Sequence, residues 1–236
     1  MAKRAGAKKT ARKTARKTAG KAASKAARPP RGGTDRPAAM DSAGTDAAAA
    51  LRRALLVLVE ERGWIDLSFA EIAEQAGVPI GEAHGIYSSK GAILTALTRA
   101  LDERVLAGLE TDALEGTVKD RLFDLLMRRF DLLKADRAAY RRLMRQLPMT
   151  PAEFKALLCQ LRRSLSLTLE AAGLSASGIK GALRLQGLTA IYLAGLRAFA
   201  GDDTEDLSRT MAEIDKRLSQ AERVSEMLHR RRPAAA

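Results

Sequence analysis

The spacing of apolar residues is the feature that most restricts the fold of this chain. From Asp46 onward, apolar residues recur three and four positions apart, and no convincing run of alternating apolar and polar residues occurs. A three-to-four spacing places these side chains on one face of a helix, whereas a half-buried strand needs strict alternation. We therefore predict an all-α chain with about nine helices.

Capping residues divide this pattern into segments. Ser68 and Glu71 have the spacing of a capping box, and Ser89 precedes another apolar run. Thr150 is followed by Pro151 and by Glu153, which is typical of a helix start. The expected helices cover approximately residues 51–62, 69–76, 80–87, 90–109, 119–135, 136–147, 151–172, 177–200 and 204–228.

Positive charge is concentrated at the beginning of the chain. Residues 1–33 contain seven Lys and five Arg without any Asp or Glu, which gives +12 of a formal net charge of +13. Apart from Met1, Ala is the only aliphatic residue in this segment. Such a segment cannot bury enough apolar surface to offset the entropy lost on ordering. We expect residues 1–45 to form a disordered basic arm.

The arm is expected to bind a polyanion, because dense Lys and Arg displace the counterions condensed on nucleic acids. Double-stranded DNA is the preferred partner, and RNA or an anionic membrane surface is the next. A solubilising tail, or an extension upstream of a start at Met40, is the alternative. The expected phosphate contacts are Lys9, Arg12, Lys13, Arg16, Lys17, Lys21 and Lys25.

Several classes of protein are disfavoured by composition. One Cys and two His argue against a disulfide framework and a common zinc site. The uncharged stretch Leu185–Leu196 has 12 residues, whereas a membrane span needs about 20. No phosphate loop or nucleophile motif is present, so we expect neither catalysis nor a cofactor. Cys159, between Leu158 and Leu161, is expected to be a buried thiol. The expected location is the cytoplasm, in association with the nucleoid.

A specific set of motifs lies within residues 51–97. An apolar segment ends in Glu-Arg-Gly and is followed by Ser-x-x-x-Ile-Ala-x-x-Ala-Gly-Val at Ser68–Val78. Gly81, an aromatic-Ser-Ser-Lys turn at Tyr87–Lys90 and an Ile-Leu-x-Ala-Leu helix start come next. This ordered set resembles the helix-turn-helix domain of TetR/AcrR-family transcriptional regulators. Residues 121–133 and 202–222 look like a TetR-like subgroup distantly similar to a ubiquinone-biosynthesis accessory protein.

The resemblance implies a set of DNA-contacting positions. The family usually has Tyr at the position of His84, and the reading helix 80–87 contains no Lys or Arg. Residues 46–95 carry four basic and seven acidic side chains, a net charge of −3. Either the arm supplies the missing positive charge or the DNA function has faded. The implied DNA-binding residues are Ser68, Ile80, Gly81, Glu82, His84, Gly85, Ile86, Tyr87 and Lys90.

The same resemblance implies a C-terminal domain at 96–229, after the helix-turn-helix domain at 46–95 and before a tail at 230–236. This domain would bind an unknown small apolar or amphipathic effector and form a homodimer. The predicted effector pocket consists of Phe123, Met127, Phe130, Tyr140, Met144, Phe154, Gln186, Thr189 and Tyr192. The predicted dimer interface consists of Leu185, Leu188, Leu196, Leu207, Met211, Ile214 and Leu218.

Two functions remain open from the sequence. The preferred one is a dimeric, ligand-responsive transcriptional regulator whose arm adds non-specific phosphate contacts. The alternative is a TetR-fold accessory protein that binds a lipid or isoprenoid and no longer reads DNA.

Overall fold

The computed structural model describes residues 38–110 and 112–230. Residues 1–37 of the predicted arm and residues 231–236 of the predicted tail lie outside the described residues. The arm's seven expected phosphate contacts are therefore among the residues that the structure does not describe: Lys9, Arg12, Lys13, Arg16, Lys17, Lys21 and Lys25.

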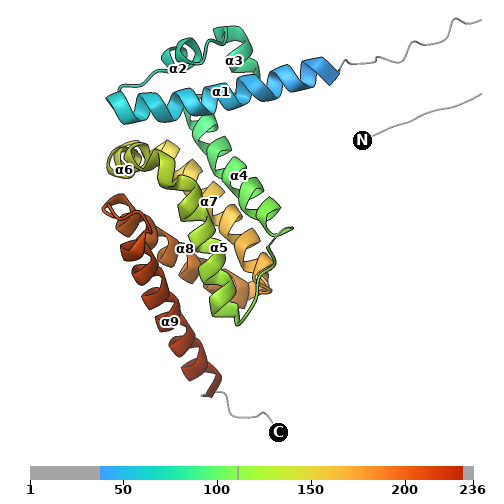
Figure 1. Cartoon of the computed structure of the whole chain (residues 1–236), viewed down its shortest axis with the longest axis vertical. Coiled ribbons are helices and arrows are strands. Elements are labelled where there is room, and N and C mark those ends of the chain that lie inside the picture. The colour runs from blue at the N-terminus through green and yellow to red at the C-terminus, as the bar shows by residue number, and fades with distance from the viewer. Residues whose placement is uncertain (1–37, 111, 231–236) are drawn as a thin grey trace, which may run out of the picture. The chain divides into compact units, whose positions relative to one another are not determined.

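The described residues form nine α-helices and two short 3₁₀ turns, and no strand occurs among them (Figure 1). The predicted all-α fold is confirmed. None of the described helices combines the length and apolar character needed to cross a membrane. The helices are α1 (Ala38–Arg62), α2 (Phe69–Gln75), α3 (Ile80–Ile86), α4 (Lys90–Gly108), α5 (Val118–Leu133), α6 (Arg137–Gln146), α7 (Pro151–Ala171), α8 (Gly178–Ala200) and α9 (Ser208–Arg230), with 3₁₀ turns at Lys134–Asp136 and Leu147–Met149.

Several helix starts follow from capping side chains. The capping box predicted at Ser68 and Glu71 is present, and Ser89 caps α4 by accepting from the Ala92 N–H. A second capping box, formed by Thr117 and Asp120, begins α5 and was not predicted. Each box satisfies backbone donors that a helix N-terminus leaves unpaired.

Two helix starts and one helix cap differ from the sequence prediction. Helix α1 begins at Ala38, within the expected arm, consistent with the high helix propensity of its Ala-rich first half. Thr150 makes no side-chain cap at α7, because its hydroxyl donates to the Leu147 carbonyl instead. The last helix begins at Ser208 rather than near Thr204.

The loop before α9 is organised by a buried carboxylate. Asp202 is 1% exposed and accepts hydrogen bonds from the backbone N–H and hydroxyl groups of Thr204 and Thr210. Burial raises the pKa of Asp202, but these hydrogen bonds lower it more, to about 2. The carboxylate therefore holds the loop and the first turn of α9 together while it is ionised.

Two apolar cores lie within the described residues. The first is formed by α1 to α4 around Trp64, which is fully buried, and it also takes in Ala139, Leu143 and Leu147 from α6 and the turn after it. The second is formed by α4, α5, α7, α8 and α9 around Phe130, which packs against Tyr192 and Phe199. Because α4 and Tyr140 of α6 contribute to both cores, the helix-turn-helix segment is anchored to the rest of the fold.

Candidate functional site

The turn between α2 and α3 presents a short helix to the surface. Gly77 adopts a positive φ of 66°, which an L side chain rarely adopts, and the next N–H, that of Val78, bonds back to the Ala73 carbonyl. Val78 packs against the first core, and Ala83 of α3 is fully buried. This arrangement is a helix-turn-helix in which α3 packs inward through the buried Ala83 and the half-buried Ile86.

The outer face of α3 is exposed and contains no basic side chain apart from a histidine. Ile80 is 58% exposed, and Gly81, Glu82, His84 and Gly85 are also exposed. His84 packs edge-on against Phe69, with ring centroids 6.4 Å apart, which orients the imidazole. Ile86, which belongs to the predicted set, is half-buried against the first core.

Three other predicted DNA-binding residues have partners inside the chain. The Ser68 hydroxyl belongs to the capping box, and Tyr87 accepts a hydrogen bond from Arg52 Nη1 at 2.7 Å. Lys90 Nζ donates to the carbonyl oxygens of Trp64, Ile65 and Leu67 at 3.0, 3.4 and 2.9 Å. These three bonds use the donors of the ammonium group. In this structure Lys90 therefore fixes the turn before α2, and its phosphate contact stays a prediction.

Intrachain contacts also engage most of the cations of residues 46–95. Arg62 forms an ion pair with Glu71 at 2.6 Å. Hydrogen bonds from Ser68, together with this guanidinium, lower the pKa of the Glu71 carboxyl to about 2. Arg52 and Lys90 donate hydrogen bonds to Tyr87 and to backbone carbonyls. Among the Lys and Arg residues of 46–95, the exposed Arg53 remains without an ion pair or hydrogen bond in the structure.

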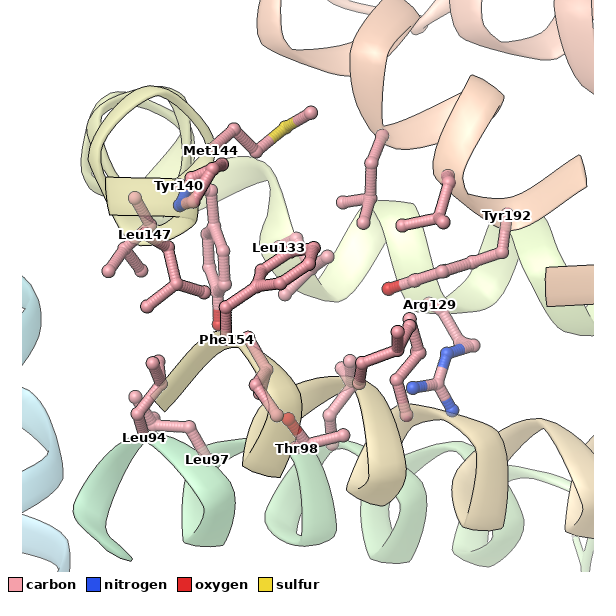
Figure 2. A pocket seen from close by; sticks show the side chains of 18 residues that line it. Leu94, Leu97, Thr98, Arg129, Leu133, Tyr140, Met144, Leu147, Phe154 and Tyr192 are labelled. Carbon is pink, nitrogen blue, oxygen red and sulfur yellow. The ribbon is translucent and has the colours of Figure 1, made fainter. Parts of the chain in front are cut away.

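A second candidate site is an apolar pocket of about 170 Å³ in the C-terminal part of the chain. It lies between α4, α5, α6, α7 and α8, and its wall is mostly leucine (Figure 2). Phe154 and Leu193 line the pocket and are 38% and 40% exposed, so they lie on the side nearest the surface. The lining residues are Leu94, Leu97, Thr98, Leu101, Arg129, Leu133, Tyr140, Leu143, Met144, Leu147, Pro148, Phe154, Leu157, Leu158, Leu161, Tyr192, Leu193 and Leu196.

The structure brings together four of the nine predicted pocket residues, which are Tyr140, Met144, Phe154 and Tyr192. The other five lie elsewhere, because residues on the inner face of a helix fill core as readily as they line a cavity. Met127 and Phe130 are buried in the second core, and Phe123 packs against it. Gln186 is exposed and accepts from Arg162 Nη1 at 2.7 Å, while Thr189 donates to the Leu185 carbonyl.

A buried ion pair at the pocket wall was not predicted from the sequence. Arg129 is 1% exposed, and its Nη1 is paired with Asp102, which is 7% exposed. The Ser164 hydroxyl donates to the same carboxylate at 2.5 Å. Burial lowers the pKa of Arg129, but Tyr192 and Asp102 more than offset this, so the pKa lies above its ordinary value. The available signal was the spacing, since Arg129 lies three and four residues from buried leucines.

The pocket and the helix-turn-helix share one structural link. The 3₁₀ turn Leu147–Met149 and the start of α7 form part of the pocket wall. The residues that flank this turn bind Trp64: Gln146 accepts from its backbone N–H, and Glu153 accepts from its indole N–H at 2.9 Å. A displacement of the wall would therefore reach the turn that precedes α2.

The predicted dimer residues fall into two groups. Leu188, Leu207, Ile214 and Leu218 are at most 4% exposed within one chain, so they form its core rather than a free surface. Leu185 and Leu196 are half-buried against that core, and Met211 is 40% exposed. Large apolar side chains are nevertheless exposed on both α8 and α9, namely Ile179, Leu183, Leu193, Met211, Val224 and Met227.

Two further expectations concern the Cys159 thiol and metal-binding side chains. Cys159 is exposed, so the expectation of a buried thiol was wrong: Leu158 and Leu161 face the second core and Cys159 points away from it. In the part of the chain that the structure describes, no three His, Cys, Asp or Glu side chains are placed to hold a metal ion.

Comparisons with known proteins place the fold. No model of a known protein family matches the chain, and no curated protein matches it. Among solved structures, a TetR transcriptional regulator from Nitrosomonas europaea is 22% identical, with a TM-score of 0.59 over 74% of this chain and 97% of that one. A TetR transcriptional regulator from Rhodococcus sp. RHA1 is 17% identical, with a TM-score of 0.53 over 75% and 95%. These likenesses do not favour the accessory-protein alternative.

Proposed function

We propose that this chain, which has the fold of the TetR-type transcriptional regulators, is a DNA-binding regulator that acts as a homodimer and responds to a small molecule. The observation that carries the proposal is the exposed outer face of α3, held on a helix-turn-helix by the buried Ala83. A helix presented in this way fits the major groove of DNA. Such a regulator would act in the cytoplasm, on the nucleoid.

The chemistry of the α3 face supports base contacts. The imidazole of His84 can donate or accept a hydrogen bond, and Ile80 offers an apolar contact for a thymine methyl group. Glu82 can accept from the amino group of cytosine. Gly81 and Gly85 add no side chain, so the helix backbone can approach the groove closely.

Phosphate contacts would come mostly from outside this segment. Arg53 is the exposed cation of residues 46–95 that has no ion pair or hydrogen bond in the structure. Residues 1–36, which hold all the Lys and Arg of the expected arm, come before α1 in the chain. We assign non-specific phosphate binding to this arm and base recognition to α3, because counterion release depends on charge and not on sequence.

Dimerisation would use the exposed apolar side chains of α8 and α9. Ile179 and Leu183 are 91% and 66% exposed, and Val224 and Met227 are 51% and 56% exposed. Large apolar side chains left in water on neighbouring helices are typical of an interaction surface. A second copy of the chain would cover them, and the pair would present two α3 helices to successive major grooves.

Ligand response would use the link through Trp64. A molecule in the pocket contacts Leu147, Pro148 and Phe154, and the flanking residues Gln146 and Glu153 hold Trp64. A ligand that binds one arrangement of this wall more tightly than another would shift the position of α2 and α3.

DNA binding by α3 variants tests the proposal. We expect His84→Ala and Ile80→Ala to weaken binding to a preferred DNA sequence by about tenfold each, and to change binding to random DNA much less. Leu167→Ala, which removes an apolar side chain of α7 that is 44% exposed, is the matched control and should leave both affinities unchanged. Equal losses on preferred and random DNA would contradict a reading role for α3.

A further inference from the structure

The guanidinium of Arg129 is the buried cation with the most unsatisfied donors in the described part of the chain. Its Nη1 binds Asp102, but Nε and Nη2 are closed to solvent and have no hydrogen-bond partner. Arg121 and Arg137 each have one such atom, Nε. A buried donor without a partner costs free energy comparable to a lost hydrogen bond, and the cost is greater for a charged group.

The two unsatisfied nitrogen atoms of Arg129 form one edge of the guanidinium. Nε–H and one N–H of Nη2 point in nearly parallel directions, which is the fork that a carboxylate binds through both oxygens. Asp102 does not fill this edge, because its Oδ1 binds Nη1 and the Ser164 hydroxyl. The side chain is therefore charged, fixed by its pairing with Asp102, and unpaired but covered along the edge that recognises a carboxylate.

The guanidinium of Arg129 lies next to the apolar pocket. Arg129 belongs to the pocket wall, and its guanidinium lies beside the ring of Tyr192, with 5.3 Å between Cζ and the ring centroid. Figure 2 shows Arg129 and Tyr192 together on one side of the pocket, and Tyr140, Met144 and Leu147 on the other. Apart from Arg129, the wall is leucine, aromatic, Met and Pro side chains with the hydroxyl groups of Thr98, Tyr140 and Tyr192.

This combination selects one class of ligand. A neutral apolar molecule would fill the pocket but leave the edge of Arg129 unpaired, whereas a multiply charged anion would face a single cation already shared with Asp102. A monocarboxylic acid with an apolar body satisfies both parts of the site. Because Nε and Nη2 are covered, the carboxylate must displace the side chains over them, and so its binding changes the wall of the pocket.

We propose that the pocket binds a monocarboxylic acid with an apolar body, whose carboxylate pairs with the Nε–Nη2 edge of Arg129. The body of the acid then extends toward Met144, Leu147 and Phe154. Its far end reaches the wall segment that holds Trp64, so the length of the apolar body determines how far that segment moves. The inference names the effector class of the proposed regulator, and the binding itself is measured without DNA.

The test compares an acid with its uncharged ester. Octanoic acid and methyl octanoate are titrated into the full chain at pH 7, and binding is followed by calorimetry. We expect the acid to bind at least tenfold more tightly than the ester, since a charge-assisted hydrogen bond contributes about 1.5–3 kcal/mol and 1.4 kcal/mol is tenfold. Equal affinities, or no binding of either probe, would overturn the proposal.

Two variants and a control assign the effect to Arg129. Arg129→Lys keeps a cation beside Asp102 but removes the fork, so the preference for the acid should fall at least tenfold. Arg121→Lys, on the same helix and outside the pocket wall, should retain the preference. Asp102→Asn keeps Arg129 but removes the negative charge beside it. The ratio of acid affinity to ester affinity should therefore be higher in this variant than in wild type.

If Arg129→Lys does not fold, folded Asp102→Asn decides the question. If neither variant folds, the titrations of the unchanged chain with acid and ester decide it. An unchanged preference for the acid in Asp102→Asn, or a preference that survives in folded Arg129→Lys, would contradict the assignment. Binding of DNA without any acid separates this inference from the proposed function. Sequence-selective DNA binding with no acid binding would refute the effector class alone, whereas acid binding without DNA selectivity would refute the regulator role alone.

Discussion

Removing Asp102 should destabilise the chain strongly, because it leaves the Arg129 charge buried without its partner. Arg129 and Asp102 are 1% and 7% exposed, so water cannot replace the carboxylate without local opening. Breaking a buried ion pair by deleting one partner costs about 3–5 kcal/mol. We therefore expect Asp102→Ala to lower the free energy of unfolding by that amount, a large part of the ~5–15 kcal/mol of a typical domain. The Ser164 hydroxyl would also lose its acceptor.

Replacing both partners separates the cost of an unpaired charge from the loss of packing. The double variant Asp102→Leu with Arg129→Met removes the charge and fills a similar volume, and such replacements are often neutral or stabilising. We expect its free energy of unfolding to lie within about 1 kcal/mol of wild type. The assay is urea unfolding followed by circular dichroism at pH 7, with the slope of the transition compared between variants. A loss below about 1 kcal/mol for Asp102→Ala would refute the reasoning, since it would mean that the charge has another partner.

Three further predictions concern single side chains. Glu153→Ala should cost about 1–3 kcal/mol in urea unfolding, because it leaves the buried indole N–H of Trp64 without an acceptor, and an unchanged transition would contradict this. Gly181→Ala should lower the Tm, since a Cβ there would lie 2.1 Å from the carbonyl carbon of Ala176, and an unchanged or raised Tm would show that α8 can shift freely. Asp202, whose pKa is depressed from 3.8 to about 2, contributes about 2 kcal/mol above pH ~4 that is lost as the pH falls toward 2. Asp202→Asn should remove that part of the acid dependence, measured as the free energy of unfolding against pH.

The elements that depend on local sequence were predictable. The all-α class follows from three-to-four spacing, and the starts of α2 and α4 follow from Ser68 and Ser89, each within three residues of its partner. The capping pattern at Thr150 failed for two reasons. The Thr150 hydroxyl donates to the Leu147 carbonyl, three residues away, and Glu153 accepts from the indole N–H of Trp64, 89 residues away in the chain.

The composition of the pocket was only partly predictable. Tyr140, Phe154 and Tyr192 were expected there, but a helix pattern cannot distinguish a side chain that lines a cavity from one that fills a core, and Phe130 proved to be core. Arg129 and Asp102 are polar residues on apolar helix faces, which is a visible signal. Their pairing joins positions 27 residues apart on different helices and needs the tertiary structure.

The most direct test of the central claim is to measure DNA selectivity with and without the basic arm. Chain lacking residues 1–36 retains all of α1 and both apolar cores, so it should remain folded. Genomic fragments captured by the full-length and shortened proteins would be sequenced at two salt concentrations. The account predicts that the shortened protein binds more weakly, with a smaller salt dependence, and still enriches the same sequence motif. Loss of all sequence preference with the arm would contradict the role assigned to α3.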